Sequence, residues 1–196
     1  SRPGAAIPAA MIRGRQMDEI TKLMVEQLRD AYSAEKQALR AMPRMMKKAT
    51  AQSLKDALQM HVDQTEGQVE RLEKGLEMLG GKPGRKVCEG MRGIIEEGQH
   101  ELEDHEKGPL LDTLIVAMQQ RVEHYEIASY GTMAALAKAC GQQQLADLLA
   151  QTLQEEKQTD EKLTQLAESE LNPQAIQGMQ EPEAANDRRG GGKRSA

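Results

Sequence analysis

Four glutamates occupy positions where the sequence pattern requires side chains that face the core of a helix bundle. They interrupt four separate stripes of apolar residues at helical spacing, one in each stripe: Glu35, Glu66, Glu126 and Glu156. Glu35, for example, follows Ala31 by four residues and precedes Ala38 by three. Each glutamate lies near the midpoint of its predicted helix, and midpoints share one level in an up-and-down bundle. The four carboxylates are therefore expected to converge.

Such a cluster of acidic side chains needs neutralisation. A buried carboxylate without a partner costs several kcal/mol, and several carboxylates together repel one another. No Lys or Arg lies on the stripes at that level, so a bound metal ion is the simplest resolution, with partial protonation as the alternative. A single glutamate of this kind is more often an exposed residue at the edge of a stripe, and only the whole set indicates a metal site.

Further carboxylates lie one helical turn from these glutamates. They are Asp63, Glu123 and Asp160, each three or four residues from one member of the set. A second oxygen donor on the same helix face is typical of two-metal carboxylate sites, and oxygen ligands suit hard cations, among which iron and manganese are redox-active. We therefore predict a dinuclear iron or manganese site with the ligands Glu35, Asp63, Glu66, Glu123, Glu126, Glu156 and Asp160. No catalytic residue is predicted.

Histidines and tyrosines are weaker candidates for this site. His61 precedes Glu66 by five residues, and His124 lies off the stripe beside Glu123. We interpret His124 as a surface residue or an outer neighbour of the ligands. Tyr130 lies one turn from Glu126 and could hydrogen-bond a ligand, although a core tyrosine is the favoured interpretation.

The elements that must position these residues are helices. The chain of 196 residues contains no Trp or Phe, three Tyr and 12 Met, a composition that favours helices over strands. Apolar residues at helical spacing mark four long segments, near 20–50, 54–79, 111–136 and 145–166. Short connections join the first to the second and the third to the fourth, whereas residues 80–108 form a long connection. This pattern predicts an all-α fold, a ferritin-like four-helix bundle with one long crossover that contains a short extra helix.

The predicted bundle spans residues 17–171, between two tails. Residues 1–16 are predicted to form a flexible N-terminal tail, and residues 172–196 a disordered, basic and Gly-rich C-terminal tail. The net charge of −5 argues against nucleic-acid binding by the bundle, which leaves only the basic tail for such contacts. No apolar run reaches the roughly 20 residues of a membrane span, and two isolated cysteines favour a cytoplasmic location.

Five stretches resemble, in this order, the ferritin-like YciE/YciF family of bacterial stress proteins. They are LRDAYSAEKQALRAMPRM, HVDQTEGQVERLE, KPGRKVCEGMRGIIEEG, VEHYEIASYGTMAALA and LLAQTLQEEKQTDEKLTQLA. The similarity covers nearly all of residues 17–171, although Arg121 stands where we expect Lys in the family. The resemblance implies a bundle with an additional short helix, a homodimer and induction under stress. The biochemical activity of the family is poorly defined.

The chain is also remotely similar to rubrerythrins. The carboxylate positions of that family are matched here by Glu35, Glu66, Glu123, Glu126 and Glu156. Val69 stands in place of the second-helix His, and Asp160 in place of the fourth-helix His. The missing imidazoles make the site more anionic, which favours the oxidised metal and weakens one metal position.

These observations predict a dimetal-carboxylate stress-response protein that binds iron or manganese and reacts with peroxide or oxygen. They leave open whether it is an enzyme of the ferroxidase or peroxidase kind. The alternative is a non-catalytic stress or scaffold protein that dimerises through the bundle. Its inward carboxylates would then be solvated by internal water or hydrogen-bonded to Tyr32 and Tyr130.

Overall fold

The structure, a computed structural model, describes the backbone of residues 9–180 and the side chains of residues 18–178. Every regular element in this part of the chain is a helix, which confirms the predicted all-α class. The helices are α1 (Ala9–Lys48), α2 (Gln52–Met78), α3 (Glu89–Asp104), α4 (Pro109–Ala139), α5 (Gln143–Leu166) and α6 (Asn172–Gln180). A π-helical segment, Ala167–Leu171, joins α5 to α6.

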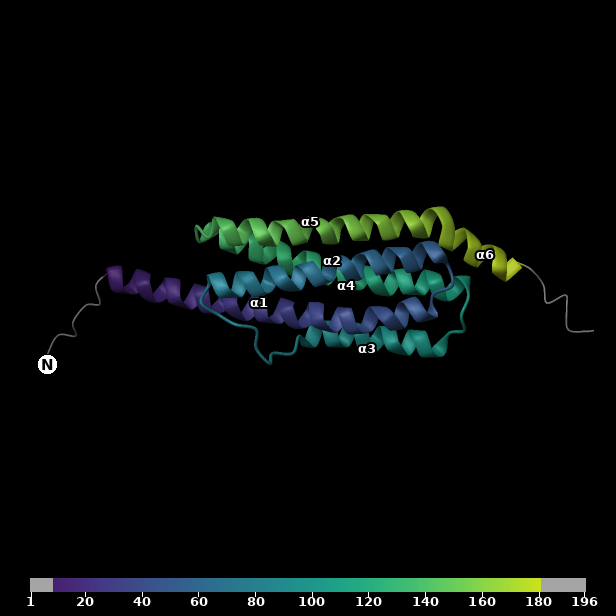
Figure 1. Cartoon of the computed structure of the whole chain (residues 1–196), viewed down its shortest axis with the longest axis horizontal. Helices are drawn as coiled ribbons and strands as arrows, with labels where there is room; N and C mark the ends of the chain where they lie inside the picture. The colour runs from purple at the N-terminus through teal and green to yellow at the C-terminus, as the bar shows by residue number, and fades with distance from the viewer. Residues whose placement is uncertain (1–8, 181–196) are drawn as a thin grey trace, which may run out of the picture.

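The four long helices α1, α2, α4 and α5 lie side by side in a bundle (Figure 1). Within it α1 packs on α2 and α4, while α5 packs on α4 and α2. The connection from α2 to α4 returns along the bundle and contains α3, which packs against α1 and α4 (Figure 1). This is the predicted ferritin-like bundle with one long crossover and a short extra helix. The N-terminal part of α1 extends beyond the other helices.

Glycine ends two of the long helices. Gly80 and Gly141 have φ angles of 69° and 74°, in the left-handed region that side chains disfavour. Beyond them, the amide of Gly81 donates to the carbonyl of Leu76 (2.8 Å), and that of Gln142 donates to Ala137 (2.9 Å). These bonds satisfy carbonyls at the helix ends, so α2 and α4 stop at levels that match their neighbours.

Asp112, in the first turn of α4, fixes the tight turn between α1 and α2. Its carboxylate accepts hydrogen bonds from the amide of Thr50 (2.7 Å), the hydroxyl of Thr50 (2.5 Å) and the amide of Ala51 (2.8 Å). Asp112 is only 1% exposed. It satisfies amides at the start of α2 that have no partner within the helix, and it ties three helices together at one end of the bundle.

The core has an apolar cluster at each end of the bundle. One contains Leu28, Leu72, Leu76, Met133, Leu145 and Leu149, and the other contains Met45, Leu54, Leu58, Leu111, Ile115 and Leu163. Between them the helices place buried polar side chains, among them Glu35, His61, Gln68, Glu123, Glu126 and Glu156. The bundle therefore has a polar layer enclosed by apolar layers.

The structure changes the predicted limits of the folded unit. The C-terminal tail was expected to start at residue 172, but residues 172–180 form α6, which packs on α4, and Ala175 is buried. Pro173 follows directly on the π-helical segment Ala167–Leu171, a local change in the helical hydrogen-bond pattern at which a residue without an N–H can be accommodated. At the other end α1 starts at Ala9 rather than near Met17. The remainder of both predicted tails, including the basic C-terminal segment, lies outside the described residues.

None of the helices in residues 9–180 has an apolar stretch long enough to cross a lipid bilayer.

Candidate metal centre

Five ionisable side chains from the four long helices form the centre of the polar layer. α1 supplies Glu35, α2 supplies His61, α4 supplies Glu123 and Glu126, and α5 supplies Glu156. Each is at most 1% exposed. On α4 the two glutamates are three residues apart, so both project from the same face of the helix.

Four of these residues lie close enough together that they could hold one metal ion. His61, Glu123, Glu126 and Glu156 each offer one ligand atom, and these atoms all lie within 4.8 Å of one another. Nε2 of His61 lies 3.1 Å from Oε1 of Glu123. One imidazole and three carboxylates form a donor set that suits iron or manganese.

Glu35 lies beside this group and has its own fixed position. The buried hydroxyl of Tyr130 donates to Oε1 of Glu35 at 2.5 Å. The carboxyl group of Glu35 approaches that of Glu126, and Glu123 approaches Glu156 in the same way. Paired carboxylates of this kind could bridge two ions or hold them from either side.

Most ligand atoms of the centre lack a hydrogen-bond partner. The buried atoms that form no hydrogen bond are both oxygens of Glu126 and Glu156, one oxygen each of Glu35 and Glu123, and both ring nitrogens of His61, although Nε2 of His61 lies close to Glu123. Buried polar atoms are almost always satisfied in proteins, since an unsatisfied one costs about 1–3 kcal/mol and a charged one more. So many unpaired donors and acceptors at one point fit a site that binds metal.

Burial and mutual repulsion perturb every ionisable group here. Loss of solvation raises the pKa of Glu35, Glu126 and Glu156 well above its usual value, and the neighbouring carboxylates raise it further. The pKa of Glu123 is raised to about 7, again chiefly by burial. Burial lowers the pKa of His61, so its imidazole is held neutral, as a metal ligand must be.

Gln119 and Arg71 lie beside the ligand residues and interact with them. Nε2 of Gln119 donates to Oε1 of Glu123 at 2.7 Å. At the edge of the polar layer, Arg71 forms an ion pair with Glu155 and donates from Nε to the hydroxyl of Thr152 at 2.9 Å. The positive charge of Arg71 lies near enough to Glu35 to lower its pKa, but this effect is smaller than that of burial.

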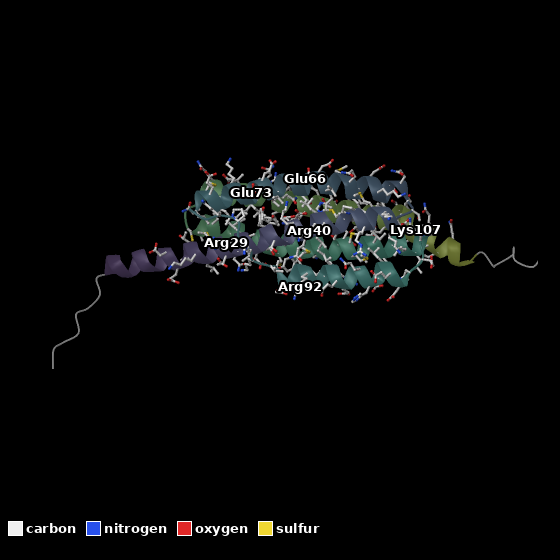
Figure 2. All side chains as sticks on the ribbon, turned by 60° about the horizontal axis from the view of Figure 1, so that its bottom comes forward. Arg29, Arg40, Glu66, Glu73, Arg92 and Lys107 are labelled. Atoms are coloured by element: carbon white, nitrogen blue, oxygen red, sulfur yellow. The ribbon has the colours of Figure 1, made fainter. Side chains whose placement is uncertain are left out.

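The structure does not bring Glu66 and Asp63 into this group. Both are exposed, and Figure 2 shows Glu66 on the outer side of the bundle. The prediction that Glu66 faces inward is wrong because it assigned the wrong rotation to α2. The buried stripe of α2 contains Leu54, Leu58, His61, Thr65, Gln68, Leu72 and Leu76, with Ala57, Val69 and Gly75 buried beside it. Glu66, one residue after Thr65, is turned about 100° away from this stripe.

Asp160 lies at the rim of the layer. It is partly buried and accepts from Nε2 of Gln120 at 3.0 Å, while its other oxygen lies 3.2 Å from Nε2 of His124. His124 is largely exposed, with 69% of its side chain accessible, in agreement with its interpretation as a surface residue. Asp160 is therefore an outer neighbour of Glu123, whose pKa its charge helps to raise.

His61 is the residue that the sequence analysis ranked too low. A signal for it existed: leucines precede it by three and seven residues and follow it by eleven, as expected for a residue on the core stripe. The stripe was hidden because its middle third is polar, with His61, Thr65 and Gln68 all buried. Val62 and Val69 each follow a residue of this stripe by one position and gave a competing apolar pattern, although Val69 is itself buried.

Comparison with known proteins identifies relatives over nearly the whole helical unit. The family described as "Domain of unknown function (DUF892)" matches residues 19–176. Protein YciF of Escherichia coli (strain K12) is 42% identical over 160 residues, which cover 81% of this chain and 96% of YciF.

Solved structures agree with this result. The crystal structure of the E. coli stress protein YciF matches with a TM-score of 0.74 and covers 78% of this chain and 97% of that one. YcfI from Rhodopseudomonas palustris, described as a structural protein, matches with a TM-score of 0.72 at 38% identity, covering 74% and 92%. Protein XCC3681 from Xanthomonas campestris, at 24% identity and a TM-score of 0.65, covers 82% and 99% and shares the fold.

Proposed function

This chain belongs to the DUF892 family, with the stress protein YciF among its relatives, and we propose that it is a dimetal-carboxylate protein of the stress response. It binds iron or manganese between its four long helices. The observation that carries the proposal is the set of buried, unpaired ligand atoms on His61, Glu123, Glu126 and Glu156. Without cations, that arrangement buries repelling carboxylates with no compensation.

The charges of the centre are consistent with two divalent ions. Four carboxylates, from Glu35, Glu123, Glu126 and Glu156, would offset two charges of +2, with neutral His61 as the nitrogen ligand. Besides burial, the charges of Glu35, Glu123 and Glu156 all act on Glu126 and raise its pKa, so Glu126 is the bridge that we propose. A bound iron or manganese ion would supply one-electron chemistry toward peroxide or oxygen.

The protein's own residues prepare this chemistry in three ways. The apolar clusters on both sides of the layer keep bulk water away from the ligands. Tyr130 and Gln119 hold Glu35 and Glu123 through hydrogen bonds of 2.5 and 2.7 Å, so the carboxylates are oriented before an ion arrives. Only one imidazole is present among the five ligands, and a strongly anionic set stabilises the higher oxidation state.

Metal binding can be measured on purified protein stripped with a chelator and given anaerobic ferrous iron or manganese. We expect stoichiometric metal by elemental analysis and a rise in melting temperature, because an ion that binds only the native state stabilises it. Glu126→Gln and His61→Gln should each lose metal and the accompanying stabilisation.

Glu66→Gln is the matched control, since it makes the same chemical change on an exposed face of α2. It should bind metal as the unaltered protein does. Substoichiometric metal in the unaltered protein would contradict the proposal, and so would equal losses in Glu66→Gln and Glu126→Gln.

A non-catalytic scaffold is the second candidate, and it is favoured by the description of YcfI from R. palustris as a structural protein. In a scaffold the inward carboxylates would be protonated or hydrated. The triple variant E35Q/E126Q/E156Q separates the two functions, since it removes repulsion without changing side-chain size. A scaffold should keep its dimerisation and gain stability, whereas the metal protein loses metal-dependent stabilisation.

Two further expectations belong to the same proposal. Cys88 and Cys140 are free thiols, which suits the reducing cytoplasm. The resemblance to the YciE/YciF family supports a homodimer, and sedimentation velocity measures its association state directly.

A further inference from the structure

A basic groove runs along the outer side of α1, where the loop before α3 and the first turns of α3 cover it. Two neighbouring hollows of about 570 and 330 Å³ form the groove and share Gln37, Arg40 and Arg92. Figure 2 labels Arg40 on α1 and Arg92 on α3. The cations that line the two hollows are Lys36, Arg40, Arg44, Arg85, Lys86 and Arg92, and the one acidic lining residue is Glu96.

Half of these cations are already neutralised by neighbouring carboxylates. Arg92 pairs with Glu89 and Glu96, and Lys86 lies within 3.7 Å of Glu26 and 3.6 Å of Asp30. Arg44 lies 3.5 Å from Glu103. These pairs form the rims of the groove.

The remaining three cations have no carboxylate partner among the described residues. They are Lys36, Arg40 and Arg85, and all line the larger hollow. Lys36 and Arg40 are four residues apart on α1, a spacing at which like charges on a helix repel. This unbalanced positive charge stands out in a chain whose net charge is −5.

Hydrogen bonds hold the loop side of the groove in place. Nε2 of Gln37 donates to the carbonyl of Cys88 at 3.1 Å, and the amide of Cys88 donates to the hydroxyl of Ser33 at 3.0 Å. Arg29 donates from Nε to the carbonyl of Lys82 at 2.9 Å. The loop that carries Arg85 is thereby fastened to α1 on both sides of that residue, so the groove exists before any ligand binds.

We propose that this groove binds a small phosphate-bearing molecule through Lys36, Arg40 and Arg85. Guanidinium groups recognise phosphate through paired hydrogen bonds, and an ammonium adds a point charge. The volume of the larger hollow falls within the range of about 300–1,000 Å³ that is typical of small-molecule sites. The ion-paired rims disfavour nucleic acid, since Lys86 and Arg44 are already paired with Glu26, Asp30 and Glu103 and offer no surplus positive charge to an extended phosphate backbone.

The groove is separate from the metal centre, and so is its test. We choose fructose 1,6-bisphosphate as the probe, because it is compact, carries two phosphates and chelates metal weakly, with fructose as the uncharged control. Isothermal titration calorimetry at about 0.05 M salt should detect saturable binding of fructose 1,6-bisphosphate and no binding of fructose. The variant K36Q/R40Q/R85Q should bind about tenfold more weakly or worse, with the metal content of the protein unchanged.

The variant K74Q/K157Q serves as the control because it removes exposed positive charges from α2 and α5, outside the groove. It should bind the probe as the unaltered protein does. Equal weakening in both variants, or no binding of bisphosphate, would overturn the proposal. Tighter binding of a short DNA duplex than of the bisphosphate would overturn it as well. A change of association state in K36Q/R40Q/R85Q, measured by sedimentation velocity, would instead assign these cations to an interface between chains.

Discussion

Tyr130 shows how much a single buried hydroxyl contributes to the centre. It is 1% exposed and donates to Oε1 of Glu35, whose other oxygen has no hydrogen-bond partner. Tyr130→Phe keeps the ring but leaves Glu35 with no donor. We expect the metal-free protein to lose about 1–3 kcal/mol of unfolding free energy, measured by urea denaturation.

Tyr32→Phe is the control for this substitution. Its hydroxyl bonds to the exposed Glu73 at 3.1 Å, where water can replace it, so the loss should stay below about 0.5 kcal/mol. Equal losses of unfolding free energy in the two variants would mean that the buried hydrogen bond between Tyr130 and Glu35 stabilises the protein no more than the exposed one does.

The buried carboxylates predict how the stability of the metal-free protein changes with pH. The pKa of glutamate is 4.5 in the unfolded chain, but burial raises the pKa of Glu123 to about 7 and that of Glu35, Glu126 and Glu156 well above 4.5. The native state therefore binds more protons, and stability falls as pH rises from about 5 to 8. His61 opposes this trend because burial lowers its pKa, but it is one group against four.

The raised pKa of Glu123 alone corresponds to a loss of unfolding free energy on the order of 3 kcal/mol as the pH rises from the unfolded to the native pKa of this group. Urea midpoints measured in the presence of a chelator should decrease through this pH range. The variant E123Q/E126Q removes two of the titrating groups and should flatten the profile. A midpoint that rises with pH in the metal-free protein would contradict the burial of these carboxylates.

At the residue scale, the inward-facing glutamates were predictable on α1, α4 and α5 but not on α2. Glu35, Glu126 and Glu156 were expected to face the core because each lies on a stripe at helical spacing, marked by residues such as Ala38, Val122 and Leu163, and the structure buries all three. On α2 the polar residues lie on the core face itself, so hydrophobicity pointed to the adjacent face. A pattern of apolar residues cannot locate a stripe at the point where function has made it polar.

At the scale of elements, Asp112 is the residue on which the junction of α1, α2 and α4 depends most. Asp112→Ala removes three hydrogen bonds and leaves the amides of Thr50 and Ala51 without that acceptor. We expect a loss of about 2–3 kcal/mol of unfolding free energy. Asp147→Ala, at an exposed position near the start of α5, should cost less than about 0.5 kcal/mol in the same urea titration. Similar losses in both variants would contradict the role of Asp112.

The helices themselves were predictable because long amphipathic segments with glycine at their ends allow few alternatives. The order of short, long and short connections also followed from segment spacing, which gave the crossover and α3. Helix α6 was not predicted because Pro173, considered alone, indicates the end of a helix. The π-helical segment that precedes Pro173, and the burial of Leu171 and Ala175 on either side, become evident only from the structure.

At the scale of the whole molecule, two apolar clusters lie on either side of a layer of buried ionisable side chains, and a third apolar cluster joins α3 to α1 and α4. The apolar clusters stabilise the fold, and the polar layer destabilises it unless cations are bound. Metal ions would thus act as structural partners of the bundle as well as reactive groups. The basic groove on α1 lies outside this layer, so its ligand and the metal ions can be varied independently.

The most direct measurement is anomalous diffraction from crystals of the protein loaded with manganese or iron. The account predicts anomalous density enclosed by His61, Glu123, Glu126 and Glu156, with a second position beside Glu35. Density at Glu66, Asp63 or another exposed carboxylate, with the interior free of it, would contradict the account.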